Sequence, residues 1–380
     1  MPGNIHTFGR MSKNTTQERL DHLDAMRGIA AMMVLLGHYI NWKYKDVLWI
    51  KLLSFPFNAN DAVSFFFVLS GFVLSWKYLQ DNRLPLAINK FYIQRLFRLF
   101  PGFAIALLAD LVFFNRDQLS WQVFRETFIL NRNQFWEEFF LFRGYNTIFL
   151  PGWTLTIELC MSFLMPFLIV VGRYNPRLLL PFAAATLLGA YITGLFMFHF
   201  ILGIWIAANV DWIRSMQFRE SGWYRYRWLI LITGCVLFSL RMADRIVPFD
   251  SGLMYILNYL KLDYFIFSAI GSLIFIVYSL HFRGVGKLLC HPVLLFYGKI
   301  SYGIYLIHWV YVMAFYTYWD TLLSYTGGSD KILFIAGLAG VVLLSTLSAA
   351  AIYYGVERPF INLSKKLSRK WKDRWLVVQA

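Results

Sequence analysis

Hydrophobic residues recur along this chain in long runs, not in the one-sided or alternating patterns of soluble helices and strands. The runs reach the length that an α-helix needs to cross a bilayer. They lack the period-two alternation of membrane barrels. We predict an all-α membrane protein, a polytopic bundle of about ten transmembrane helices. The predicted spans are residues 24–42, 61–79, 96–114, 151–171, 178–192, 193–210, 228–241, 262–280, 300–319 and 332–354.

Composition and charge support this prediction and orient the chain. Hydrophobic residues make up 58% of the 380 residues, and charged residues make up 15%, against roughly a quarter in soluble domains. If the amino terminus is cytoplasmic, 25 of the 36 lysines and arginines fall in cytoplasmic segments and 11 in outer segments. This asymmetry follows the positive-inside rule, so we predict a multi-pass protein of the inner (cytoplasmic) membrane with both termini cytoplasmic. The net charge of +15 then reflects topology and contact with anionic membrane lipids, not nucleic-acid binding.

The chain is predicted to form one membrane domain between two short tails. We place a cytoplasmic amino-terminal tail at residues 1–21, the transmembrane domain at 22–360 and a basic cytoplasmic tail at 361–380. The first residues lack the pattern of a cleavable signal, so the first helix is expected to act as an uncleaved one. The three cysteines have no metal-ligand spacing, and we expect neither a metal site nor a disulfide framework.

The first span carries two ionisable residues, Arg27 and His38, which lie eleven positions apart. On a helix this spacing is three turns plus roughly 20°, with about 16 Å of rise. One helix face therefore carries a guanidinium near the cytoplasmic side and an imidazole deep in the membrane. Ionisable groups at that depth are costly, and they commonly line a pathway or a reaction site.

The third span opens with Arg95 and Arg98, which lie on adjacent turns of one helix face at its cytoplasmic end. Arginines at this position often extend to lipid phosphates. The alternative is a guanidinium pair that binds a phosphate-bearing ligand, because arginine offers a planar, bidentate fork to phosphate oxygens. Pro101 and Gly102 follow directly and are expected to loosen the helix beside the pair.

The fourth span places Glu158 about 12 Å below the outer surface. This span runs from outside to inside and the first from inside to outside, so Glu158 and His38 can lie at similar depth. One interpretation is that the carboxylate and the imidazole are partners in a reaction site. The other is a structural polar pair that clamps two helices together.

The ninth span carries Ser301, Tyr305 and His308 at positions i, i+4 and i+7, which form one polar stripe on an apolar helix. His308 taken alone is more typical of a hydrogen-bonded packing residue than of a catalyst. In the second span, Ser70 and Gly71 favour close helix packing. The outer segment 115–150 is rich in aromatic residues, which indicates an interfacial belt or a stacking surface for a sugar.

Several fragments occur in a fixed order across residues 22–360: LDAMRGIAAMMVLLGHY, VSFFFVLSGFVLS, FYIQRLFRLFP, GWTLTIE, HFILGIWIA, ISYGIYLIHW and GVERPF. As a set they resemble the acyltransferase-3 family of integral membrane O-acyltransferases. The resemblance implies an enzyme that moves acyl groups, commonly acetyl, onto hydroxyls of cell-surface or exported carbohydrates, including lipid-linked glycans. It implies acyl-coenzyme A as the cytoplasmic co-substrate, with acetyl-coenzyme A as the expected donor, and no permanently bound cofactor.

The resemblance also assigns roles to individual residues. His38 is expected to be the catalytic general base, and Arg27, Arg95 and Arg98 are expected to bind acyl-coenzyme A. A neutral imidazole can take the proton of a sugar hydroxyl as the hydroxyl attacks a thioester. Glu158 matches the family's motif glutamate and is expected to orient the imidazole, as the acid does in a catalytic triad. We expect direct transfer to the hydroxyl, with an acyl-histidine relay as the less favoured route, and no appended periplasmic hydrolase-like domain.

The residues that would contact the substrate or stabilise an oxyanion are less well defined, and five candidates are Trp153, Thr154, Ser301, Tyr305 and His308. A proton-coupled transporter or flippase of a glycan or acyl compound is the rival class, since buried ionisable residues serve a carrier equally well. A non-catalytic receptor is a third class, which would leave these residues without a role. The sequence leaves open the acceptor sugar, the acyl group and the number of copies, with a homo-oligomer as one alternative.

Overall fold

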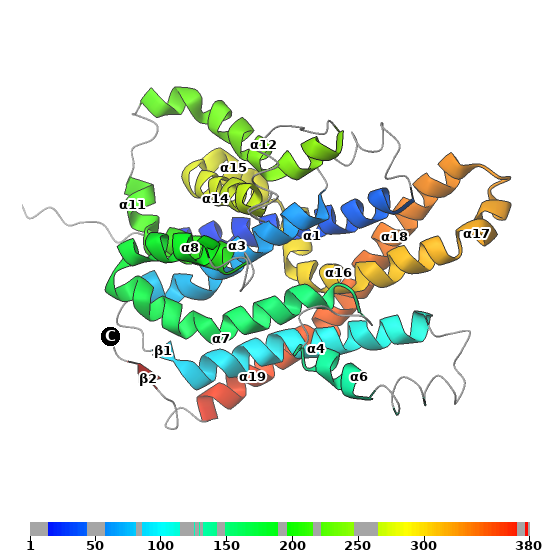
Figure 1. The fold of residues 1–380 in the computed structure, drawn as a ribbon, viewed down its shortest axis with the longest axis horizontal. Helices are drawn as coiled ribbons and strands as arrows, with labels where there is room; N and C mark the ends of the chain where they lie inside the picture. Colours follow the sequence, from blue (N-terminus) through cyan, green and yellow to red (C-terminus); the bar gives the residue numbers. More distant parts are fainter. Residues whose placement is uncertain are drawn as a thin grey trace, which may run out of the picture.

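The computed structural model of the chain describes residues 14–43, 58–80, 86–114, 125, 129, 132–142, 149–188, 196–215, 222–246, 265–370 and 377–378. Nearly all of these residues are helical (Figure 1), which confirms the predicted all-α class. Within them, the extended structure is one antiparallel pair of two-residue strands, β1 (Leu86–Ala87) and β2 (Val377–Val378).

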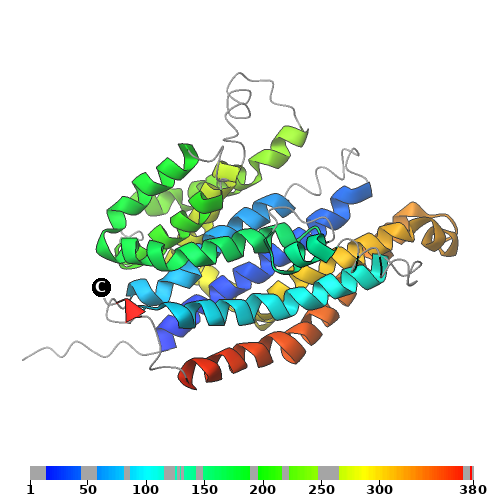
Figure 2. The ribbon, with the colours of Figure 1, turned by 60° about the horizontal axis from the view of Figure 1, so that its bottom comes forward.

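Six helical stretches of the described residues are long and apolar enough to cross a membrane. They lie alongside one another in the bundle (Figure 2), and the last of them is a continuous helix with a π-helical turn inside it. The six are α1 (Asn14–Lys43), α3 (Ala59–Gln80), α4 (Ile88–Phe114), α7 (Gly152–Tyr174), α16 (Pro292–Thr317) and the run of α18 (Asp330–Ile352), η5 (Tyr353–Glu357) and α19 (Arg358–Lys370).

The remaining predicted spans coincide with four shorter helices, so each of the predicted ranges overlaps a helix. These are α8 (Leu179–Leu188), α10 (Phe196–Ala208), α12 (Arg227–Ile246) and α14 (Phe265–His281). The protein is therefore a helical membrane protein, while the number of crossings and the sides of the termini stay predictions. Short connecting elements are α6 (Arg132–Phe139), η3 (Pro176–Leu178), α11 (Val210–Ser215), η4 (Gly222–Tyr226), α15 (Arg283–Leu289) and α17 (Trp319–Tyr325).

Two helices begin earlier than their hydrophobic runs suggest. The α4 helix starts at Ile88 where the run predicted 96, and α16 starts at Pro292 where it predicted 300. The first turns of α4 carry polar residues that hydropathy assigns to a loop, whereas those of α16 are mainly apolar and the predicted start lies eight residues too late. The chain beyond 361, predicted as a tail, likewise stays helical to Lys370 as α19, which packs along α4 (Figure 2).

Glycines bring α1 and α16 into close contact. A Cβ atom at Gly28 would overlap the backbone of Gly298, and a Cβ at Gly298 would overlap the backbone of Asp24. Small residues at a helix contact let two backbones approach closely in a membrane protein. The same holds for α3 and α10, where Gly71 lies against the backbone of Phe200. The α1–α16 contact sets the positions of the polar side chains that both helices carry.

Candidate active site

A cavity of about 1080 Å³ lies among α1, α3, α4, α7, α16 and the η5–α19 segment. Its walls come from the middle of α1, most of α3, the first three turns of α4, the second to fourth turns of α16, η5 and α19, and from the first two turns of α7. The predicted topology places the start of α4 and the end of α3 on the cytoplasmic side and the start of α7 on the outer side. The charged residues that line it are Asp24, Arg27, Lys77, Lys90, Arg95, Arg98, Glu158, Lys299, Glu357, Lys365 and Arg369.

Positive charge dominates the cavity, which has eight basic and three acidic side chains in its wall. Two of the acids are already paired: Asp24 Oδ1 is 2.9 Å from Arg27 Nη2, and Glu158 forms an ion pair with Arg95. Among the residues that the structure describes, no ion pair involves the other six basic side chains, which are Lys77, Lys90, Arg98, Lys299, Lys365 and Arg369. A low-dielectric cleft lined by one sign of charge attracts ligands of the opposite sign.

Arg95 is held against α7 by two contacts. Its Nη2 group donates to Glu158 Oε1, and its Nε group donates to Ser162 Oγ at 3.2 Å. Only 8% of Arg95 is exposed. A guanidinium in that position needs a nearby counter-charge, because an unpaired buried charge is costly. The expected contact between Glu158 and His38 is therefore replaced by one between Glu158 and Arg95.

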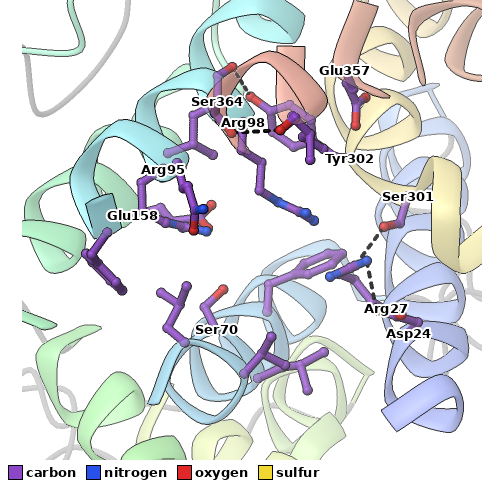
Figure 3. A pocket seen from close by; sticks show the side chains of 18 of the residues that line it. Asp24, Arg27, Ser70, Arg95, Arg98, Glu158, Ser301, Tyr302, Glu357 and Ser364 are labelled. Atoms are coloured by element: carbon purple, nitrogen blue, oxygen red, sulfur yellow. Dashed lines mark hydrogen bonds and ion pairs between the residues drawn. The ribbon is translucent and has the colours of Figure 1, made fainter. Parts of the chain in front are cut away.

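Arg98 lies one turn further along α4, with its guanidinium directed into the cavity (Figure 3). Within the described ranges no hydrogen bond or ion pair involves this guanidinium. Arg27, in contrast, is anchored: its Nε donates to Ser301 Oγ at 3.0 Å and its Nη2 to the Gly298 carbonyl at 3.3 Å. Of the predicted arginines, Arg98 is thus the one whose planar fork is free for an anion.

His38 makes its side-chain contact with a second histidine. Its Nδ1 atom is 3.0 Å from Nε2 of His308, and the two rings stack with their centroids 5.2 Å apart. His308 Nδ1 is 3.1 Å from the carbonyl oxygen of Ile304, one turn earlier in α16. The Trp309 ring stands edge-on to His38 at 5.5 Å. Neither histidine is part of the cavity wall.

Thr154 and Tyr305 connect the cavity to this histidine pair. Both line the cavity, and their side-chain oxygens are 2.7 Å apart. The centroid of the Tyr305 ring is 5.9 Å from that of His308. Thr154 donates its single hydroxyl proton to the Pro151 carbonyl at 3.0 Å, so the shared hydrogen bond is donated by Tyr305.

The polar stripe predicted on the ninth span therefore faces three partners in turn. Ser301 contacts Arg27, Tyr305 contacts Thr154, and His308 contacts His38. Trp153 takes no part in this arrangement. Its ring lies outside the cavity wall and packs against two phenylalanine rings, that of Phe67, which lines the cavity, and that of Phe196, which does not.

With this geometry in place, comparison with known proteins gives the family. The sequence profile of a family described as "Acyltransferase domain" matches residues 20–354. The chain belongs to the acyltransferase-3 family. Nodulation protein 10 of Rhizobium leguminosarum bv. viciae is similar to it, with 25% identity over 397 aligned positions that cover 96% of this chain and 97% of the relative. No solved structure matches the chain significantly. The protein is a membrane acyltransferase.

The sequence assigned no functional role to three charged residues that line the cavity of this acyltransferase, namely Glu357, Lys365 and Arg369. Glu357, in the GVERPF fragment, is 3% exposed, and its Oε1 atom has no hydrogen-bond partner among the described residues. Glu158 was singled out as a carboxylate inside a predicted span, whereas Glu357 lies three residues beyond the predicted span 332–354, so the same criterion did not select it. In the sequence analysis, Lys365 and Arg369 counted only as cytoplasmic charges that orient the chain in the membrane. In the structure they line the cavity from α19.

The aromatic outer segment of the acyltransferase is only partly described. In and beside α6, Phe135, Trp136, Phe139 and Phe140 form a cluster with ring centroids 5.1 to 6.0 Å apart. Trp121, Phe124 and Tyr145, which belong to the same predicted surface, lie outside the described residues. Whether this segment is an interfacial belt or a sugar-stacking surface stays a prediction.

Proposed function

We propose that this chain is an inner-membrane O-acyltransferase that uses cytoplasmic acyl-coenzyme A, with acetyl as the acyl group. The acceptor is a hydroxyl of a cell-surface or exported carbohydrate, either free or lipid-linked. One observation carries the proposal: a cationic cavity, whose basic side chains come mainly from helix segments near the predicted cytoplasmic side, extends to residues that contact a histidine pair.

The donor end of the site is the cationic part of the cavity. Coenzyme A is polyanionic, and six basic side chains that lack an ion pair among the described residues match that charge. Arg98 offers the free bidentate fork that suits a phosphate. Arg95 and Arg27 are held by Glu158 and Asp24, so they contribute fixed positive charge in defined positions.

The thioester end of the donor belongs at Thr154 and Tyr305, the inner polar residues of the cavity. There the developing oxyanion needs hydrogen-bond donors, which are worth most where water is excluded. Tyr305 donates to Thr154 in this structure. For Tyr305 to stabilise the oxyanion, its hydroxyl exchanges Thr154 for the substrate oxygen.

His38 is the general base of the proposed reaction. It takes the proton from the acceptor hydroxyl while the hydroxyl oxygen bonds to the thioester carbonyl carbon. The carbon–sulfur bond then breaks, and the sulfur leaves as a thiol with the proton that His38 returns. The products are the acylated carbohydrate and coenzyme A. The acceptor enters from the outer side, because the donor occupies the opposite one.

The proposal is tested with purified protein, labelled acetyl-coenzyme A and either a free or a lipid-linked glycan. We expect label on the sugar with the wild type, loss of transfer with His38→Ala, and normal transfer with the matched control His291→Ala. His291 caps α16 at an exposed position outside the cavity. Full transfer by a folded His38→Ala variant would contradict the proposed base. Uptake of label into vesicles without acylation would instead show a transporter.

A further inference from the structure

The two contacts of His308 restrict where its protons lie. Its Nδ1 atom is 3.1 Å from the Ile304 carbonyl oxygen, which only accepts hydrogen bonds. Nδ1 of His308 therefore carries a proton. In the opposite tautomer two lone pairs would face each other across this contact.

His308 is also uncharged in this setting. Its side chain has no exposed surface, and the ring nitrogens contact a carbonyl and another imidazole. A buried cation without a counter-ion is strongly unfavourable. A neutral imidazole has a single N–H, so Nε2 of His308 is bare and accepts a hydrogen bond.

From these contacts we infer that His308 is a positioning residue that selects one tautomer of His38. Because His308 Nε2 accepts, the proton of the 3.0 Å contact belongs to His38 Nδ1. Neutral His38 then has its lone pair on Nε2. The ring also interacts with the Val34 backbone, one turn earlier in α1. In this tautomer Nε2 is the ring atom that can take a proton.

The catalytic consequence rests on the proposed function. When His38 Nε2 takes the hydroxyl proton, the resulting imidazolium still donates from Nδ1 to a nitrogen acceptor on His308. A catalytic triad uses a carboxylate at this position to fix the tautomer and to stabilise the cation. Here a neutral imidazole serves instead, and it avoids a permanent charge at membrane depth. This also explains why Glu158 is free to pair with Arg95.

Substitutions at His308 distinguish two roles of its side chain, accepting a hydrogen bond from His38 and filling space between the helices. Glutamine reaches about as far as Nε2 and offers an oxygen that accepts from His38, whereas leucine fills similar space without an acceptor. We expect His308→Gln to keep kcat within about tenfold of the wild type and His308→Leu to lose about 100-fold or more. KM for acetyl-coenzyme A should stay unchanged in both, because His308 does not line the cavity. Wild-type kcat in His308→Leu would overturn the inference.

Nitrogen-15 NMR of histidine-labelled protein in bilayers tests the tautomer without any turnover. Signals of His38 and His308 are assigned by their loss in His38→Ala and His308→Gln. We expect both rings to be protonated on Nδ1 and bare on Nε2. A His38 ring protonated on Nε2 would overturn the inference even if His308→Leu failed to fold. Absence of acyl transfer by the wild type would count against the proposed function alone, since the NMR result does not depend on it.

Discussion

Glu158 on α7 and Arg95 on α4 form an ion pair in the wall of the cationic cavity. The pair joins two helices and leaves Arg95 with a fixed direction, because Ser162 holds its Nε as well. Arg98, one turn away, has no such anchor among the described residues and extends into the cavity (Figure 3). The two arginines of this short motif thus differ. Arg95 is a positive charge in a fixed position, and Arg98 has a guanidinium that can form bidentate hydrogen bonds with a ligand.

The first prediction concerns the guanidinium of Arg98. Arg98→Lys keeps the charge but removes the bidentate geometry, so we expect KM for acetyl-coenzyme A to rise about tenfold with little change in kcat. Steady-state kinetics and calorimetric titration of coenzyme A measure the effect. The matched control is Arg177→Lys, an exposed arginine outside the cavity. An unchanged KM in Arg98→Lys would show that this guanidinium does not bind the donor.

A second prediction compares neighbouring lysines of α19. Lys365 lines the cavity and Lys366 does not, although both are exposed. We expect Lys365→Ala to weaken coenzyme A binding severalfold and to reduce its salt dependence, because one partner of the phosphates is lost. Lys366→Ala should leave both unchanged. Acetyl-pantetheine, which lacks the nucleotide, should be used equally well by the two variants; if Lys365→Ala impairs it too, the loss is structural.

The third prediction concerns Glu357. Its buried carboxylate lines the same cavity as Arg98 and Arg27, and it opposes the binding of an anion there. Glu357→Gln keeps the shape and removes the negative charge, so we expect coenzyme A to bind about fivefold more tightly. Direct titration with coenzyme A measures this change. Asp320→Asn, an exposed position on α17, is the control for a lost acidic charge. Weaker binding by Glu357→Gln would mean that the carboxylate contacts the ligand directly.

The fourth prediction tests the α1–α16 contact. A methyl group at Gly28 overlaps the Gly298 backbone, whereas one at Gly340 on α18 meets nothing within 4 Å. We therefore expect Gly28→Ala to lower the thermal unfolding midpoint and to raise KM for the donor, since Arg27 loses its place beside Ser301. Gly340→Ala should be neutral or slightly stabilising, because alanine favours a helix by about 1 kcal/mol over glycine. Equal midpoints for the two variants would contradict close packing at Gly28.

Much of the fold was predictable from the sequence because hydrophobic length is a local property. Every predicted span overlaps a helix of the described residues, although the number of membrane crossings is still a prediction. The sequence also singled out the side chains that now meet, since an ionisable residue in an apolar run is visible without a structure. Arg27, His38 and His308 came from that criterion and Ser301 from the polar stripe on the ninth span, and the structure brings the four together in two pairs.

The choice of partner was not predictable from the sequence, because it depends on which helices are neighbours. Depth alone suggested that Glu158 meets His38, whereas the packing of α7 against α4 puts Glu158 beside Arg95. The role of α19 was missed for a related reason. Its basic residues match the positive-inside rule whether or not they line a cavity, so the charge count cannot distinguish the two arrangements.

The glycine contact between α1 and α16 has a consequence for which donors the enzyme can use. Arg27 and His38 lie on one helix, and both are hydrogen-bonded to α16, so the two side chains are held at a fixed separation. Under the proposed roles, we expect this separation to favour acyl carriers whose anionic end and thioester are equally far apart. A small activated donor such as an acyl phosphate would be too short to reach both residues at once.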